Sequence, residues 1–123
     1  GLEALAASTT LKMQKLILAR NDLHPAAGEA IATAPWAPGL VHLDVSSNEM
    51  FGDGGLRALA ESTQLTSLKT LLLEFTGLHD EAVEIFKAPL FQQLERIDIS
   101  ATGVDIDELR PFLGERVEWK RGV

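Results

Sequence analysis

A phrase of spaced apolar residues recurs four times along this 123-residue chain. Its clearest copy is LVHLDVSSNEM, residues 40–50, which ends in an asparagine, a polar residue and Met50. The alternation within each copy predicts a short strand with one buried face, because successive side chains of a strand point to opposite sides. The same apolar position of each copy recurs at intervals of 27, 28 and 26 residues: Leu16, Leu43, Leu71 and Ile97. This period predicts a solenoid, in which each repeat buries its apolar face only against its neighbours.

A segment that can form a helix follows each phrase. The first is expected over residues 26–33, and the proline-rich run 34–39 ends it, because proline cannot continue a helix. The second is expected to open at Asp53, a residue suited to capping, and to turn Leu56 and Leu59 inward. The third is expected from about residue 80 to 87 and the last over residues 106–112. Four residues are expected to cap, end or distort these last two helices: Pro89, Asp105, Pro111 and Gly114.

The two tryptophans lie outside the phrases. Trp36, in the proline-rich run, is expected to fill the outer core beneath its loop, and the alternative is that it projects and binds. Trp119 and Val117 flank Glu118 in an alternation that predicts a final edge strand. We expect Trp119 to cover the last repeat, because a solenoid needs its end residues covered.

The first eight residues, GLEALAAS, compare directly with GLRALAES at 55–62. We interpret them as the tail of a repeat whose strand is not present. The chain would then be one domain with a partial repeat at 1–10, about four repeats over 11–112 and a C-terminal edge at 113–123. It would be a fragment of a longer protein, and its uncovered N-terminal end could stack on another domain or on a second copy.

The phrases MQKLILARNDL, LVHLDVSSNEM, LKTLLLEFTGL and LERIDISATGV resemble the leucine-rich repeat family. Helical segments such as GDGGLRALAES look like its ribonuclease-inhibitor-like subclass, and the ending LRPFLGERVEWKRGV looks like the C-terminal edge of bacterial members. The resemblance implies an α/β right-handed superhelix with a short parallel sheet on its concave side and helices on its convex side. It also implies a protein-binding scaffold that is not an enzyme. Thr76 and Thr102 depart from the pattern by replacing the asparagine, so we expect looser turns there, because threonine lacks the second donor of an amide.

Residues between the buried positions of the strands should face outward and stack into columns across the sheet. The central column is expected to be Ile17, Asp44, Leu72 and Asp98, continued by Glu118. The columns beside it are Lys15, His42, Thr70, Arg96 and Arg116 on one side, and Ala19, Ser46, Glu74, Ser100 and Lys120 on the other. The strand exits carry Arg20, Ser47, Phe75 and Ala101.

Two groups in these columns point to binding. Ile17, Leu72 and Phe75 are apolar where solvent is expected, and exposed apolar clusters often mark interaction sites. The alternative is that Leu72 and Phe75 pack on each other or on a neighbouring strand. The acidic group could steer a basic partner, or could simply pair with Lys15 and Arg96 across the sheet. The predicted protein-binding residues are Ile17, Arg20, His42, Asp44, Leu72, Glu74, Phe75, Arg96 and Asp98.

A second hypothesis is regulation of an enzyme such as a small GTPase. Repeats of the ribonuclease-inhibitor-like kind resemble those of GTPase-activating proteins, which use the edge of the repeats. Arg20 or Arg96 would then be the arginine that stabilises the transition state. A third hypothesis is structural assembly through the N-terminal end.

The amino-acid composition limits the classes of partner that the protein could bind. A net charge of −7 argues against nucleic acid and anionic membranes, which require basic patches. With no cysteine in the chain, disulfides, thiolate metal sites and cysteine nucleophiles are excluded, and we expect a cytoplasmic protein. No apolar run approaches the ~18 residues that span a bilayer.

Few residues in the sequence are candidates for a metal site, a phosphate-binding loop or a catalytic site. His24 and His79 occupy equivalent turns two repeats apart, too far to share one metal, so we expect no metal and no cofactor. The run GDGG at 52–55 lacks the spacing of a phosphate loop and a following lysine. His42 is spaced by four from Ser46 on an open strand face, which offers no oxyanion hole, so no catalysis is expected.

Overall fold

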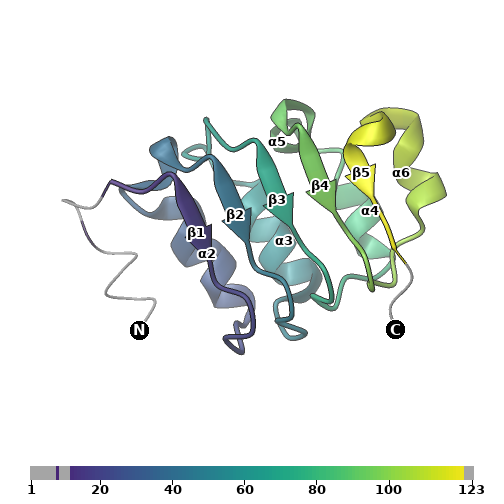
Figure 1. Ribbon diagram of the computed structural model, residues 1–123, viewed down its shortest axis with the longest axis horizontal. Helices are drawn as coiled ribbons and strands as arrows, with labels where there is room; N and C mark the ends of the chain where they lie inside the picture. The colour runs from purple at the N-terminus through teal and green to yellow at the C-terminus, as the bar shows by residue number, and fades with distance from the viewer. Residues whose placement is uncertain (1–7, 9–11, 121–123) are drawn as a thin grey trace.

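Five short strands form one parallel sheet in chain order. The structure is a computed structural model that describes residue 8 and residues 12–120. The strands are β1 (Lys15–Ile17), β2 (His42–Asp44), β3 (Thr70–Leu72), β4 (Arg96–Asp98) and β5 (Val117–Glu118). Figure 1 shows them side by side, with the long helices stacked behind the sheet. The predicted α/β repeat solenoid is therefore confirmed.

Helices connect the strands and cover one face of the sheet (Figure 1). They are α2 (Pro25–Thr33), η1 (Ala37–Gly39), α3 (Gly52–Ala60), α4 (Glu81–Ile85), α5 (Pro89–Gln93), α6 (Ile106–Leu113) and η2 (Gly114–Arg116). The other face of the sheet, which we call the open face, carries none of the helices formed by the described residues. None of the helices in the described part of the chain is long and apolar enough to cross a membrane.

The core follows the predicted period. Leu16, Leu43, Leu71 and Ile97 lie beside one another in neighbouring strands, and each is buried. Trp36 is also buried, at 4% exposure, so the prediction that it fills the outer core is confirmed.

Helices α2 and α3 approach closely at two glycines. A Cβ atom on Gly28 would lie 2.5 Å from the carbonyl oxygen of Gly55, which is closer than real Cβ contacts come. Glycine at position 28 therefore lets two neighbouring repeats stack helix against helix.

Asn48 and the two threonines behave differently, as their chemistry requires. The buried Asn48 side chain bonds to backbone atoms of both its own repeat and the preceding one. Thr76 and Thr102 donate their hydroxyls to carbonyls three residues back, those of Leu73 and Ile99, at 2.7 and 2.6 Å. Neither threonine side chain reaches back to the preceding repeat, so these turns carry fewer side-chain bonds between repeats.

One predicted core position is wrong. Met50 is 62% exposed, and Phe51 is fully buried in its place. The second repeat has one more residue between its asparagine and its next core residue than the other repeats, in which Leu23, Leu78 and Val104 are buried. The extra residue leaves the Glu49–Met50 segment projecting at the turn.

Two predicted helix signals are also wrong. Asp53 lies inside the first turn of α3, and its carboxylate accepts the backbone N–H of His79 at 3.0 Å instead of capping its own helix. Pro89 does not end the third helix, because α4 stops at Ile85 and Pro89 starts α5 in the first-turn position where proline is tolerated.

The last helix is only partly as predicted. The Asp105 side chain caps α6 by accepting the N–H of Asp107, and Gly114 closes it with φ of +67°, both as expected. Pro111 was expected to shorten or distort this helix; α6 continues through it to Leu113, so the shortening is wrong, and a distortion stays a prediction.

The C-terminal edge strand is confirmed. Val117 is buried at 4% exposure, whereas Trp119, which follows the last ladder position, is 40% exposed. That Trp119 covers the last repeat stays a prediction. The predicted partial repeat at the N-terminus lies outside the described residues, apart from Ser8.

Candidate functional site

The outward residues of the strands form the predicted central column and, over the first four strands, the predicted column beside it. The ladder pairs Ile17 with Asp44, Asp44 with Leu72, Leu72 with Asp98, and Asp98 with Glu118. Neighbouring strands lie about 4.8 Å apart, so this central column brings residues from all five strands into one row. The register therefore places side chains together that are 26 to 28 residues apart in sequence across the first four strands and 20 apart at the last step.

Three of the predicted apolar residues lie along this face and its exit side. Ile17 is 56% exposed and Phe75 is 47% exposed, whereas Leu72, between two aspartates, is half-buried. About half of Phe75 is open to solvent even if it touches Leu72. The apolar surface is therefore available.

The strand exits share an unusual backbone. Arg20, Ser47, Phe75 and Ala101 all have positive φ, between 52° and 61°. A non-glycine residue rarely adopts this region, so the turn geometry recurs in four repeats for a structural reason. Each of the four exit turns is held by a backbone bond to the segment that follows the next strand, such as Ser47 N–H to Glu74 O at 2.8 Å.

The acidic residues are oriented by the backbone. The Oδ1 atoms of Asp44 and Asp98 accept the N–H of the serine two residues on, Ser46 at 2.9 Å and Ser100 at 2.8 Å. Within the described residues, Asp44, Glu74 and Asp98 form no ion pair with Lys15 or Arg96. The alternative, pairing with Lys15 and Arg96 across the sheet, is therefore not observed, and the three carboxylates stay available.

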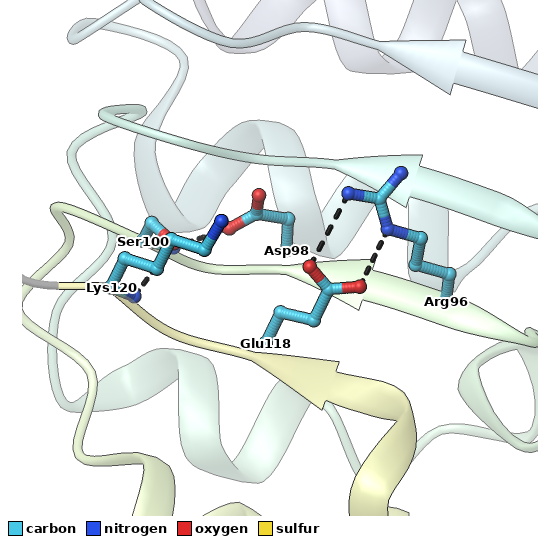
Figure 2. A network of polar contacts seen from close by, with 5 residues as sticks. All are labelled: Arg96, Asp98, Ser100, Glu118 and Lys120. Carbon is cyan, nitrogen blue, oxygen red and sulfur yellow. Dashed lines mark hydrogen bonds and ion pairs between the residues drawn. The ribbon is translucent and has the colours of Figure 1, made fainter.

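Arg96 has a different partner. Its Nε and Nη2 atoms bond to the two carboxylate oxygens of Glu118 at 2.6 and 3.3 Å, and Figure 2 shows the two groups facing each other. This hydrogen bond lowers the pKa of Glu118 and raises that of Arg96. Both side chains are partly exposed, so the pair stabilises the fold by only about 0–1 kcal/mol. The arginine is nevertheless already engaged on the open face.

Two residues assigned to the flanking columns have structural roles. The Ser100 hydroxyl accepts the N–H of Lys120 at 2.8 Å, which holds the end of the chain beside β4 (Figure 2). Arg116 does not stand in its predicted column. Its guanidinium donates to the carbonyls of Leu113, Gln92 and Leu94 at 2.8, 2.8 and 3.0 Å, and so it ties η2 to the end of α5.

Two further predicted site residues have distinct environments. Burial, with help from Lys15, lowers the pKa of His42, which lies partly buried beside Asp44. Arg20 is exposed at the exit of β1, and it forms no ion pair with any described residue. His42 therefore takes up a proton less readily than a free imidazole, and Arg20 is the exposed cation at the exit of β1.

Sequence reasoning missed three exposed apolar residues. Met50, Val41 and Trp119 are 62%, 39% and 40% exposed. The turn that holds Met50 has one extra residue, and this could have indicated that Met50 is exposed. It is hard to recognise in the sequence because Met50 and Phe51 are adjacent and both apolar.

The structure offers little for chemistry on this face. Within the described part of the chain, no group of three histidine, cysteine, aspartate or glutamate residues could hold a metal ion. A hollow of about 500 Å³ lies on the helical side instead, between the C-terminal ends of α2 and α3, and Glu29 and Glu61 line it. The open face is therefore suited to contact with a large surface rather than to enclosing a small molecule.

Comparison with known proteins supports the repeat. Residues 40–60 match the family model described as Leucine Rich repeat, and they hold β2 and α3. No curated protein sequence matches the chain. With this match, the five parallel strands alternating with helices identify the fold as a leucine-rich repeat solenoid.

Proposed function

We propose that this protein is an interaction scaffold that binds a protein partner through the open, concave face of its sheet. Leucine-rich repeats generally mediate protein–protein interaction and are typically not enzymes. One observation carries the proposal for this face. Its central column presents the exposed Ile17 and the half-buried Leu72 beside carboxylates that have no cationic partner among the described residues. Exposed apolar groups beside available carboxylates give a partner both hydrophobic and charged contacts.

The remaining predicted residues extend this surface. Phe75 and Arg20 lie at the exits, and His42 lies beside Asp44. Arg96 contributes less, because Glu118 already holds its guanidinium. We also propose a cytoplasmic protein of the ribonuclease-inhibitor-like, bacterial kind.

Site-specific photo-crosslinking tests the proposed surface. A photoreactive amino acid replaces Leu72 on the open face or, as a control, Glu84 on the exposed side of α4. After irradiation in an extract of the native host, the open-face variant should capture a defined partner that the control does not. Capture from position 84 alone, or equal capture from both, would place the contact elsewhere.

A substitution pair separates binding from folding. Leu72→Arg places a cation among three carboxylates on the surface and should abolish capture with little change in the free energy of unfolding. The control Glu84→Arg should leave capture intact. Retained capture in Leu72→Arg would refute the open face as the site.

Regulation of a small GTPase is a second candidate. The observation that favours it is Arg20, which is exposed at a strand exit and forms no ion pair with the described residues. An arginine of this kind can neutralise the charge that develops on a transferred phosphoryl group. The wild-type protein would then accelerate GTP hydrolysis, and Arg20→Ala would not. No acceleration of any GTPase tested, or acceleration unaffected by Arg20→Ala, would dismiss this role.

A further inference from the structure

The central column alternates in character from strand to strand. Ile17 on β1 and Leu72 on β3 are apolar, and Asp44 on β2 and Asp98 on β4 are acidic. Strands about 4.8 Å apart therefore present apolar, acidic, apolar and acidic groups in turn. A ligand that uses this row must match both the order and the spacing.

Both aspartates are held in place before any partner arrives. Each uses one carboxylate oxygen to accept the N–H of the serine two residues on, and its second oxygen has no protein partner within the described residues. Glu74 lies two residues beyond Leu72, in the turn that follows β3, and it is exposed. Leu72 is thus bordered by Asp44 and Asp98 along the ladder and followed by Glu74, so an apolar contact there would lie beside negative charge.

The fifth strand closes this row. Glu118 continues the column, but Arg96 already neutralises it through two hydrogen bonds (Figure 2). The unneutralised part therefore covers β1 to β4. Three intervals of about 4.8 Å make a footprint of about 14 Å.

An α-helix matches this footprint. A helix advances about 5.4 Å per turn, so a helix laid across the strands, slightly inclined, presents one side chain per turn to each strand. Residues three or four apart share one face of such a helix. An extended peptide would present same-side residues about 6.7 Å apart and would lose register within two strands.

We propose that the open face binds an amphipathic, basic α-helix of a partner protein. Apolar residues of that helix lie over Ile17 and Leu72, and lysine or arginine residues one turn away contact Asp44 and Asp98. The net charge of −7 of the chain acts in the same direction at longer range. This inference rests on the proposed function and adds the chemistry and conformation of the partner.

Designed peptides test the pattern against the full 123-residue chain. The probe is a peptide of about four helical turns in which leucine and lysine alternate every three or four residues on one face. One control peptide has the same composition with its leucines and lysines shuffled around the helix, and another replaces lysine with glutamate. Titration calorimetry should show the probe binding at least about tenfold tighter than either control, with affinity falling as salt rises.

Matched variants locate the contact. Asp44→Asn with Asp98→Asn keeps the acceptors of both serine N–H bonds but removes two charges, and it should weaken probe binding at least about tenfold. Glu29→Gln with Glu61→Gln removes the same charge from the helical side and should leave binding unchanged. Equal loss in both pairs would mean non-specific attraction, and it would overturn the proposed site.

Three further outcomes distinguish failure of the basic-helix proposal from failure of the proposed scaffold function. A probe that fails to bind, or that binds no better than its shuffled control, overturns the basic helix. If the partner crosslinked from position 72 then contacts that position through an acidic or non-helical segment, the helix is refuted and the interaction scaffold stands. If no partner crosslinks from position 72 while position 84 captures one, both are refuted.

Discussion

The side-chain oxygen of Asn48 accepts the backbone N–H of Leu23 at 2.9 Å, across a separation of 25 residues. The same oxygen accepts the N–H of Asn21 at 2.9 Å, so one side chain serves two donors of the preceding repeat. Its amide group donates to three carbonyls, two of its own repeat and one of the preceding one: Val45, Ser46 and Leu18. The buried Asn48 side chain therefore supplies hydrogen bonds to backbone groups that lie beyond the end of the strands and have no partner in the sheet.

Asn48→Ala should therefore destabilise the protein strongly. The substitution leaves several buried backbone groups without partners, and we expect a loss of about 3 kcal/mol or more in the free energy of unfolding, measured with urea. Thr76→Val is the matched control, because Thr76 makes one such side-chain bond, and it should cost about 1 kcal/mol. Equal losses in the two variants would contradict the inter-repeat role of the asparagine.

Gly28→Ala should also destabilise the protein. Alanine inside a helix normally gains up to about 1 kcal/mol over glycine. At position 28 the new methyl group would approach the Gly55 carbonyl oxygen to 2.5 Å, and such overpacking costs about 1–3 kcal/mol. Thermal unfolding of Gly28→Ala should therefore show a lower midpoint, whereas Gly39→Ala, whose nearest neighbour is 3.4 Å away, should show little change. A higher midpoint for Gly28→Ala would mean that α2 and α3 are further apart.

The sheet could be predicted from the sequence because its signal is repeated. Leucine or isoleucine recurs at a nearly constant interval, so the alignment of any one repeat is supported by the alignment of the others. The open-face columns follow from that register, since alternate side chains must face away from the core. The order Ile17, Asp44, Leu72, Asp98 was therefore predictable residue by residue.

The features that could not be predicted are local departures from the repeat, each of which occurs at only one place in the chain. Met50 and Phe51 are both apolar, and only packing shows that the turn holds an extra residue and buries the second of them. Proline can end a helix or occupy its first turn, so the sequence did not show that Pro89 starts α5. Pro111 lies inside α6, which continues past it.

The choice of ionic partners was equally hidden from the sequence. Arg96 lies beside the central column, which holds Asp98 and Glu118, and the diagonal position of Glu118 on the next strand decides the pairing. Arg116 shares the column spacing of Arg96, but it lies in a 3₁₀ turn where carbonyls face it. Spacing predicts which side chains face a surface, and local backbone geometry decides what each one contacts.

The two tryptophans should report on different environments. Trp36 is 4% exposed and Trp119 is 40% exposed. Trp36→Phe should therefore leave a red-shifted emission that iodide and acrylamide both quench, whereas Trp119→Phe should leave a blue-shifted emission that iodide hardly reaches. Quenching constants of the two single-tryptophan variants measure this difference. Equal quenching would contradict the difference in exposure between the two tryptophans.

Glu118→Gln should alter stability in a manner that depends on pH. The bond to Arg96 lowers the pKa of the folded Glu118 carboxyl below 4.5, so its contribution is present above that value and is lost as pH falls through the folded pKa. Because both side chains are partly exposed, the loss at pH 7 should be at most about 1 kcal/mol, and it should shrink toward zero in strong acid and in high salt. Urea unfolding across the acidic range measures the difference between variant and wild type. Glu115→Gln, at an exposed position with no ion pair to a described residue, is the control and should give no such trend. A difference for Glu118→Gln that stays constant with pH would mean that the carboxylate charge does not hold β4 and β5 together.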